Sequence, residues 1–443
     1  MLKGYEEYKA TGIIWIPNIP VSWDCKTIMS IFIERKEKNN PVKTKFILSL
    51  SAKQGVIPYS EKIGGGNKAK EDISDYNVAQ KGDLLINCMN VVAGSSGVSN
   101  YYGAISPVYY ALYPRNDEIS ILYYEYLFRN QLFYSSMVGL GNGIMMKKSS
   151  NGKLNTIRKR IPMEKLNRVN IPVPPLLEQR QIVSYLNWKT AQMDFFVSAK
   201  EKEIRHLEEL KKAIVNKAVT RGLNDNVPMK KTGIDWLPKI PAHWDVVKMK
   251  YLFDEISDKN HPDEEPLVAS QNMGVVPKSV YGQRTVVANG GFENFKLVKI
   301  GDFVISLRSF QGGLEYAYYQ GIISPAYTIL RCNEKSYIPY FKLLFKSIEY
   351  IALLKTCVTG IREGQNIDYN VLRVNYLPIP PLEEQKKIMF IVSEKLNKID
   401  KQIMVLNKEI ALVQELRTRI IADAVTGRID VRQVAVPEEY KVV

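Results

Sequence analysis

The stretch Pro174-Pro175-Leu176-Leu177-Glu178-Gln179 occurs twice, because Pro380-Pro381-Leu382-Glu383-Glu384-Gln385 repeats five of its six residues. Each copy precedes a long charged segment in which leucine and isoleucine recur every three or four residues. Proline cannot lie inside a helix, but it fits the first helical position, where no N–H donor is needed. Each copy therefore predicts an extended lead-in followed by the start of a helix.

The segment after the second copy has the clearer helical pattern. From Ile388 to Ala424, apolar residues follow steps of three and four, and charged or amide residues fill most other positions. This period is typical of an amphipathic helix and is close to that of a coiled-coil seam. The first segment, Leu176 to Val219, is a noisier version, and its 44 residues would make a helix about 66 Å long at about 1.5 Å per residue.

Two helices of equal length can bury their apolar stripes on each other. We expect them to pair, in antiparallel fashion if the domain between them returns the chain to the far end. The alternative is two separate helices, each packed on its neighbouring domain. The residues that we assign to the seam of the pair are Leu186, Met193, Leu207, Ile214, Ile399, Ile403, Leu406, Ile410 and Val413.

Length and composition indicate a chain of two or three domains with real cores, since 443 residues include 45 % hydrophobic ones. Apolar runs of membrane-spanning length and a signal-peptide core are both absent from the sequence. The four cysteines are scattered, without CxxC spacing. We therefore expect a cytoplasmic protein with no membrane partner, no structural disulfide and no zinc site.

The net charge of +15 is distributed unevenly. Residues 1–174 hold 23 Lys and Arg against 14 Asp and Glu, whereas the two helical segments are nearly neutral. A basic excess concentrated ahead of the first helix favours a polyanionic partner, although charge alone is weak evidence.

The segments that precede the helices are also duplicated. Thr11 to Pro20 with Trp23 returns as Thr232 to Pro241 with Trp244, and Lys81 to Ile86 resembles residues 300–305. About a dozen residues of the first copy are missing from the second, because the offset falls from 218 at Pro107 and Pro325 to 206 at Pro174 and Pro380. We expect a globular domain at 1–173, a long helix at 174–221, a second domain at 222–379, a second helix at 380–427 and a C-terminal tail at 428–443.

Each globular copy has a mixed secondary-structure pattern. Short β-branched or aromatic runs predict strands at Phe46–Leu50, Leu84–Cys88, Val108–Tyr113, Phe303–Leu307 and Tyr327–Leu330. Aromatic-rich stretches predict one helix at Ile121–Leu132 and one at Tyr340–Leu354. The fold class is therefore α+β, with two similar globular domains joined by two long helices that form an antiparallel coiled coil.

The duplication keeps landmark residues while the material between them differs. If the landmarks are scaffold, two unlike surfaces are held at a spacing that the two helices fix. Duplex DNA suits this arrangement, because two modules about 34 Å apart meet the same face of its groove. A bipartite, asymmetric target follows from unlike surfaces on a nearly symmetric frame.

These motifs resemble the specificity subunit of type I restriction–modification systems. The resemblance rests on the Thr-Gly-Ile-x-Trp openings, the doubled Pro-Pro-Leu-x-Glu-Gln and the alternation of domain and helix over nearly the whole chain. It implies that each globular unit is a target recognition domain that reads half of a split double-stranded DNA site. It also implies that the helices dock two methyltransferase (M) subunits, that restriction (R) subunits join the complex, and that this chain has no catalytic residue.

Two stretches of the first domain are candidate DNA contacts. Gly139 to Arg160 contains six cations and no acid, and Lys68 and Lys70 follow a run of three glycines. Lysines in such loops can reach phosphates, and arginine can enter a groove, while the alternative is an ordinary solvated loop. The residues assigned here to DNA binding are Lys68, Lys70, Lys147, Lys148, Lys153, Arg158 and Arg160.

The second domain offers residues of suitable chemistry on predicted loops. Gln and Asn can pair with adenine through two hydrogen bonds, and Arg can pair with guanine in the same way. Each of these residues could instead be an ordinary polar surface residue. They are Gln271, Lys278, Arg284, Arg308, Gln311, Arg362, Gln365 and Asn366.

Other polar and aromatic features have structural interpretations. Tyr101, Tyr102, Tyr318 and Tyr319 recur beside Ser-Pro landmarks, which favours packing over base stacking. Asp83 and Asp302 follow glycine before strands, which favours capping of a turn. The three histidines show no repeated arrangement, and no methyltransferase, metal or cofactor motif is evident, so we predict no cofactor and no metal.

Two other functions remain open from the sequence. One is a two-headed protein–protein scaffold that does not recognise DNA, and its basic charge would then be incidental. The other is an enzyme with an unrecognised active site in a cleft, which the lack of a repeated polar constellation disfavours.

Overall fold

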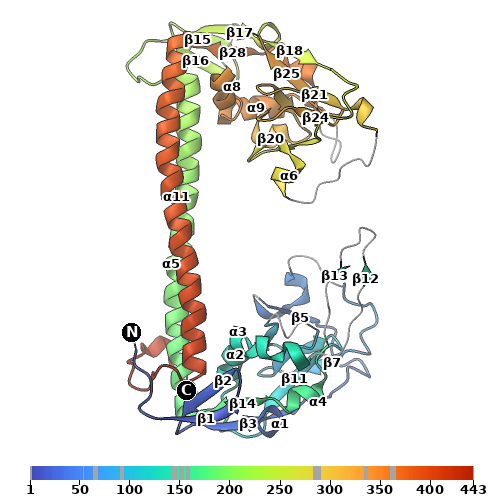
Figure 1. Cartoon of the computed structure of the whole chain (residues 1–443), viewed down its shortest axis with the longest axis vertical. Helices are drawn as coiled ribbons and strands as arrows, with labels where there is room; N and C mark the ends of the chain where they lie inside the picture. Colours follow the sequence, from blue (N-terminus) through green and yellow to red (C-terminus); the bar gives the residue numbers. More distant parts are fainter. Residues whose placement is uncertain are drawn as a thin grey trace. The chain divides into compact units, whose positions relative to one another are not determined.

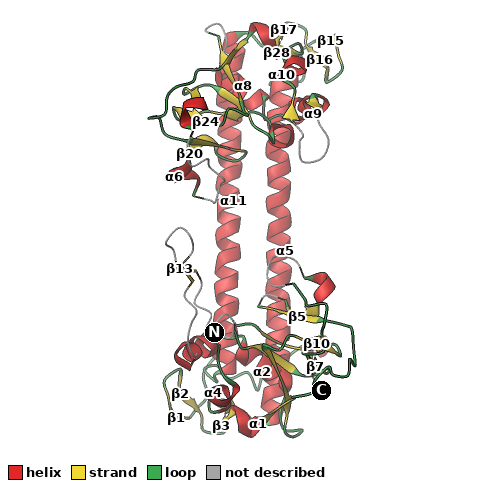
Figure 2. Cartoon of the chain, turned by 90° about the vertical axis from the view of Figure 1, so that its right-hand side faces the viewer, coloured by secondary structure: helices red, strands yellow, loops and turns green. Residues whose placement is uncertain are grey.

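The computed structural model describes residues 2–52, 54–62, 68–89, 94–140, 147–148, 154–155, 160–282, 291–333, 338–359 and 366–442 (Figure 1). Its contacts divide the chain into two compact units. Unit 1 comprises Met1–Ala199 with Lys408–Val443, and unit 2 comprises Lys200–Asn407. Each long helix therefore contributes one part to unit 1 and the other part to unit 2. Figure 2 distinguishes the helices, strands and loops by colour.

Unit 1 combines short strands and short helices with the beginning of the first long helix, α5. Its elements are β1 (Tyr8–Ile13), β2 (Ile16–Pro20), β3 (Asp24–Thr27), α1 (Ile28–Ile31), β4 (Phe32–Glu34), β5 (Leu48–Ser51), β6 (Gly55–Pro58), β7 (Asn77–Ala79), β8 (Leu84–Asn87), β9 (Ser96–Val98), β10 (Gly103–Ile105), β11 (Tyr109–Pro114), α2 (Ile121–Phe128), α3 (Gln131–Ser136), β12 (Lys147–Lys148), β13 (Leu154–Asn155), α4 (Met163–Asn167), β14 (Asn170–Val173) and the first part of α5 (Leu176–Arg221).

Unit 2 repeats this succession and ends in the first part of the second long helix, α11. Its elements are β15 (Met229–Ile234), β16 (Leu237–Pro241), β17 (Asp245–Lys248), β18 (Phe253–Ile256), β19 (Leu267–Ser270), β20 (Gly274–Pro277), α6 (Lys278–Tyr281), β21 (Lys296–Val298), β22 (Phe303–Ile305), α7 (Ser309–Gly312), β23 (Glu315–Tyr316), β24 (Gly321–Ile323), β25 (Thr328–Cys332), α8 (Ile338–Leu344), α9 (Ile348–Thr356), β26 (Val358–Thr359), β27 (Asn366–Ile367), α10 (Tyr369–Leu372), β28 (Tyr376–Ile379) and α11 (Leu382–Val425).

The main sheets of the two units have the same strand order. The four-stranded antiparallel sheet is β4-β11-β8-β9 in unit 1 and β18-β25-β22-β23 in unit 2. The register is also the same, since Leu112 lies opposite Leu84 in unit 1 and Leu330 lies opposite Phe303 in unit 2. The prediction of a duplicated α+β domain is confirmed.

Large aromatic side chains fill the core of each unit. Trp23, Tyr123 and Phe128 are completely or almost completely buried in unit 1, and Trp244 and Tyr340 are completely buried in unit 2. Each core also takes in residues of both long helices, because the two clusters include Ile182 and Val425 in unit 1 and Ile388 and Val219 in unit 2. The helices are thus part of the domain cores.

The prediction of one short helix in each domain was wrong, because the structure has two helices in each of these stretches. In unit 1 the stretch forms α2 and α3, and in unit 2 it forms α8 and α9. The break has a local cause, because a capping side chain starts the second helix of each pair. The Asn130 side chain accepts a hydrogen bond from the Leu132 N–H, and the Ser347 hydroxyl accepts one from the Tyr350 N–H.

Both long helices begin at a carboxylate that receives a tryptophan N–H. In unit 1 the Trp23 indole donates to Glu178 over 2.9 Å, and the Tyr5 hydroxyl donates to the same oxygen. In unit 2 the Trp244 indole donates to Glu384 over 3.0 Å, and His243 contacts the same oxygen at 2.7 Å. The Trp motif and the Pro-Pro-Leu-x-Glu-Gln motif are therefore two halves of one contact, which explains why the chain repeats them together.

The opposite end of each long helix is tied to the core by a tyrosine. The Tyr123 hydroxyl donates to the Val425 carbonyl over 2.8 Å in unit 1, and the Tyr340 hydroxyl donates to the Val219 carbonyl over 3.2 Å in unit 2. Glycines with positive φ, Gly222 and Gly427, follow soon after each helix ends. The sequence Ala-Val-Thr occurs at both helix ends, at 218–220 and 424–426, and its valine carbonyl is the group that the domain core binds.

Within each unit the two helices run antiparallel. In unit 1 Asp194 of α5 forms an ion pair with Arg417 of α11. In unit 2 Lys211 forms an ion pair with Asp400, and Gly222, just past the end of α5, lies beside Glu384 in the first turn of α11. Among the residues that we assigned to the seam, Leu186, Ile399 and Leu406 are buried and the others are partly buried.

The C-terminal tail is an ordered part of unit 1. Val431 and Val436 are buried in its core, and the Gln181 amide of α5 donates to the Val431 and Val434 carbonyls over 2.9 and 2.8 Å. The Asp430 N–H donates to the Lys3 carbonyl over 2.8 Å. The two ends of the chain therefore meet in this unit.

Asp83 and Asp302 cap turns, as predicted, and each also binds an arginine. Their carboxylates accept from the backbone N–H of Gln80 and Lys299, both over 2.8 Å. Asp83 pairs with Arg35, which directly follows β4, whereas Asp302 pairs with Arg331 in β25, the counterpart of β11. The duplicated acid is kept while the arginine has moved to the neighbouring strand.

Replacing Asp83 with alanine should lower the free energy of unfolding of unit 1 by about 2–3 kcal/mol, because it leaves the Arg35 guanidinium and a turn N–H without their partner. Urea unfolding followed by hydrogen exchange would measure the loss. Asp24→Ala is the matched control. The Asp24 carboxylate also forms an ion pair, with Lys26, but both of those side chains are exposed, so its loss should cost little. Equal stability of the Asp83 and Asp24 variants would contradict this account.

Candidate nucleic-acid interface

Several residues assigned to DNA binding lie outside the described part of the chain. These are Lys153, Arg158, Arg284, Arg362 and Gln365. Lys147 and Lys148 form β12, which pairs with β13 through Leu154 and Asn155. Their assignment to DNA remains a proposal that rests on the sequence.

Lys68 and Lys70 are exposed in unit 1, and the backbone beside them is fixed. The Ala69 N–H donates to the Tyr59 hydroxyl over 2.9 Å, and the Lys70 N–H donates to the Tyr76 hydroxyl over 3.2 Å. The Lys70 ammonium lies 3.8 Å from Asp75, with both groups largely exposed. Such an ion pair is weak, so both lysines can approach a phosphate.

Arg160 is exposed where the basic stretch rejoins the core. The neighbouring Ile161 N–H donates to the Cys88 carbonyl over 3.0 Å. A hydrogen bond to the Tyr110 side chain, followed by attraction to Cys88, raises the pKa of Arg160. Its guanidinium thus keeps its charge at the edge of the domain, where it can bind an anion.

Three of the residues assigned in unit 2 lie together. Gln271 stands in the turn between β19 and β20, Arg308 directly precedes α7, and Gln311 lies within α7. The Gln271 amide donates to the Arg308 carbonyl over 3.2 Å, and all three residues are exposed.

Lys346, which follows α8, joins these elements. Its ammonium donates to the Gly312 carbonyl over 2.9 Å and to the Gln271 carbonyl over 3.4 Å. We call Gln271, Arg308, Gln311, Gly312 and Lys346 the turn cluster. It presents two amides and a guanidinium, the groups that read adenine and guanine edges in the major groove.

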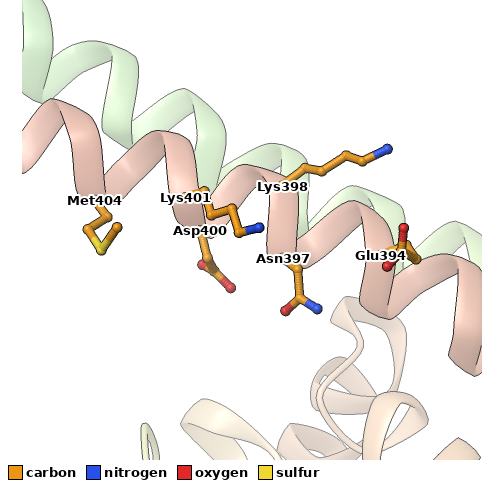
Figure 3. A pocket seen from close by; sticks show the side chains of 6 residues that line it. All are labelled: Glu394, Asn397, Lys398, Asp400, Lys401 and Met404. Atoms are coloured by element: carbon orange, nitrogen blue, oxygen red, sulfur yellow. The ribbon is translucent and has the colours of Figure 1, made fainter.

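The outer face of α11 in unit 2 has a different chemistry. A hollow of about 370 Å³ is lined by Glu394, Asn397, Lys398, Asp400, Lys401 and Met404, and Figure 3 shows Asn397, Asp400 and Met404 projecting to the same side of the helix. Phe390 is 71 % exposed and Met404 is 67 % exposed. Apolar groups among balanced charges suit a protein partner better than a polyanion.

Comparison with known proteins finds a family domain in the first part of this chain. Residues 20–204 match the type I restriction modification DNA specificity domain. The putative type I restriction enzyme MjaX specificity subunit of Methanocaldococcus jannaschii is 24 % identical over 376 residues, which cover 82 % of each chain. The MjaVIII specificity subunit of the same organism is 26 % identical over 317 residues, or 68 % of this chain and 70 % of that one.

A solved structure supports the same assignment at the level of the fold. A chain described in work on complex assembly and conformational transition of the type I R-M system aligns with a TM-score of 0.64. It is 13 % identical, and the alignment covers 93 % of this chain and 99 % of that one. The chain thus shares its fold with that structure, and residues 20–204 match the specificity-domain model.

The sequence did not single out two lysines that lie on the surface of unit 2. Lys342 and Lys346, four residues apart, lie next to the exposed loops of unit 2, and the Lys342 ammonium lies 4.4 Å from the centre of the Tyr318 ring. All four repeated tyrosines are partly exposed, but Tyr101 packs edge to face on Phe46 and Tyr318 on Tyr316, as the packing interpretation expects. Lys342 lies in α8, whereas Lys346 lies two residues beyond its end, so their spacing carried no helical signal.

The remaining assigned residues of unit 2 lie on other elements. Lys278 is the exposed first residue of α6, and Asn366 is exposed in β27, which pairs with β26. Their positions leave them free to contribute separate contacts to DNA.

Two general findings concern the described part of the chain. Within the ranges given above, no three His, Cys, Asp or Glu side chains are grouped so that they could hold a metal ion. Of the helices in that same part of the chain, none has both the length and the apolar character needed to cross a bilayer.

Proposed function

We propose that this chain is the DNA-recognition subunit of a type I restriction–modification enzyme and that it reads a bipartite, asymmetric double-stranded target. One globular domain reads each half of the target. The paired helices dock two methyltransferase subunits, which methylate adenine, and restriction subunits join the assembly. The chain supplies recognition and no catalytic group, and it acts in the cytoplasm.

The observation that carries this proposal is the difference between equivalent surfaces of the two units. The strands, their register and the helix anchors are the same, but the turn after β5 begins with Ala52 where the turn after β19 begins with Gln271. Two unlike half-sites require this combination, in which the scaffold is the same and the loops differ. Phosphate contacts from Lys68, Lys70 and Arg160 would position the DNA, and amides and arginines would specify bases.

A protein–protein scaffold without DNA recognition fits the molecule less well. The turn cluster gathers groups that match base edges, and the exposed mixed-charge face lies on α11. A division of labour between the domain loops and the helix therefore explains both surfaces. The scaffold hypothesis leaves the turn cluster without a role.

Sequencing of methylated adenines after reaction of the reconstituted methyltransferase complex tests the proposal. We expect methylation at one split sequence. Arg308→Ala should relax recognition at one or two bases of a single half-site and cost about 1–3 kcal/mol there, while the other half-site stays unchanged. Lys239→Ala, an exposed cation on β16, is the matched control. Methylation without sequence preference by the unmodified complex would refute the proposal.

A further inference from the structure

The Lys346 ammonium is directed toward the interior of unit 2. Besides the Gly312 and Gln271 carbonyls, it donates to Oε2 of Glu315 in β23 over 2.8 Å. Three donor positions of one ammonium thus meet three acceptors on three separate elements. Lys346 therefore joins the β19–β20 turn, the end of α7 and β23.

Glu315 is an unusual partner, because its side chain is completely buried. Burial raises the pKa of its carboxyl, and the nearby Lys346 lowers it. Its second oxygen, Oε1, is buried without a hydrogen-bond partner. A buried carboxylate depends strongly on its cation, so loss of Lys346 would leave Glu315 without its counter-ion.

Unit 1 contains an equivalent arrangement built from different residues. Arg129, which follows α2 as Lys346 follows α8, donates to the Ala52 carbonyl over 3.3 Å, and Ala52 matches Gln271 in the duplicated turn. Arg129 lies 3.6 Å from Glu125, whose pKa burial raises. The acidic partner of the cation lies in helix α2 in unit 1 (Glu125) and in strand β23 in unit 2 (Glu315). The cation and its contact with the turn are common to both.

The end of α7 has little room to move. Gly313 has a φ of 82°, and a Cβ atom placed there would lie 1.9 Å from the Phe345 carbonyl oxygen. The chain directly before Lys346 is therefore in contact with the chain directly after Gly312. The turn, α7 and the end of α8 form one closely packed group.

We propose that Lys346 and Glu315 are positioning residues for base reading, and that Arg129 and Glu125 have the same role in unit 1. The inference rests on the proposed function. Base reading requires side chains held to within about half an ångström, so the loop backbone must be fixed before DNA binds. Lys346 binds the backbone carbonyls of Gln271 and of Gly312, which follows Gln311, and the Gln271 amide binds the Arg308 carbonyl. The Lys346 ammonium is thereby occupied and does not serve a phosphate.

The first test uses the full chain without DNA. Lys346→Met should speed amide exchange about tenfold or more at residues 270–274 and 311–313, measured by hydrogen-exchange mass spectrometry. Lys346→Arg should retain protection, because unit 1 uses arginine at this place. Lys342→Met, a cation one turn earlier on α8, is the matched control and should leave those amides unchanged. Unchanged exchange in Lys346→Met would overturn the proposal.

The second test uses the complex with the methyltransferase and compares target with unrelated DNA. Lys346→Met should lower the specificity ratio about tenfold or more and leave the slope of log affinity against log salt unchanged. Loss of a phosphate contact would instead reduce that slope by about one and weaken both DNAs alike, which would overturn the positioning role. The double variant Glu315→Gln with Lys346→Met removes both charges, so no unpaired buried carboxylate is left to destabilise unit 2. A lower specificity ratio in this variant therefore reports the loss of positioning and not a loss of folding. If the unmodified complex shows no sequence preference, the proposed function fails, whereas the exchange result still decides the role of Lys346.

Discussion

Raising the salt concentration from about 50 to about 200 mM should weaken binding of this chain to DNA about a thousandfold. The chain carries a net charge of +15, and each cation that neutralises a phosphate releases a condensed counterion. About six such contacts give a slope near −5 for log affinity against log salt. Fluorescence anisotropy with a labelled duplex measures this slope.

Target and unrelated duplexes are compared in the same titration. Both should lose affinity with salt, because the phosphate term does not depend on sequence. The difference between them, which comes from base contacts, should persist over the range. A flat salt response, or no binding at about 50 mM, would favour the protein–protein scaffold over the DNA-recognition subunit.

Trp23→Ala should lower the free energy of unfolding of unit 1 by about 3–5 kcal/mol. The indole is completely buried, lies edge to face with Tyr5 and Tyr123, and donates to Glu178 at the start of α5. Alanine would leave a cavity between the domain core and the long helix. It would also leave a buried carboxylate with one donor fewer.

Hydrogen exchange measured during urea unfolding can assign the loss of stability to one unit. A single unfolding transition of the whole chain cannot make this distinction. Ile14→Ala is the matched control, because Ile14 belongs to the same motif and is fully exposed, and it should change stability by less than about 0.5 kcal/mol. Trp244→Ala should produce the equivalent loss in unit 2. If Trp23→Ala and Ile14→Ala behave alike, the indole does not anchor the helix.

The sequence predicted those features of the fold that depend on local chemistry. Proline at the start of a helix, the period of the apolar residues after Leu382 and the repeated Trp motifs are visible along the chain itself. They were sufficient to predict two α+β domains, two long antiparallel helices and a recognition function. The turn-capping role of Asp83 was equally local, because its N–H partner is three residues away.

The candidate site was only partly accessible from the sequence. Gln271, Arg308 and Gln311 were selected for their side-chain chemistry, but nothing in their order along the chain placed them together. Lys346, which joins them, was passed over because its three acceptors belong to residues at least 31 positions away.

Only the tertiary structure decided which residues meet. Trp23 and Glu178 are 155 positions apart, Tyr123 and Val425 are 302 apart, and the arginine that pairs with the duplicated aspartate differs between the units. Such pairs have no local signal, because each partner is acceptable by itself in its own element. Their contact depends on how the sheets and helices pack, and this packing determines which side chains face solvent and which bind each other.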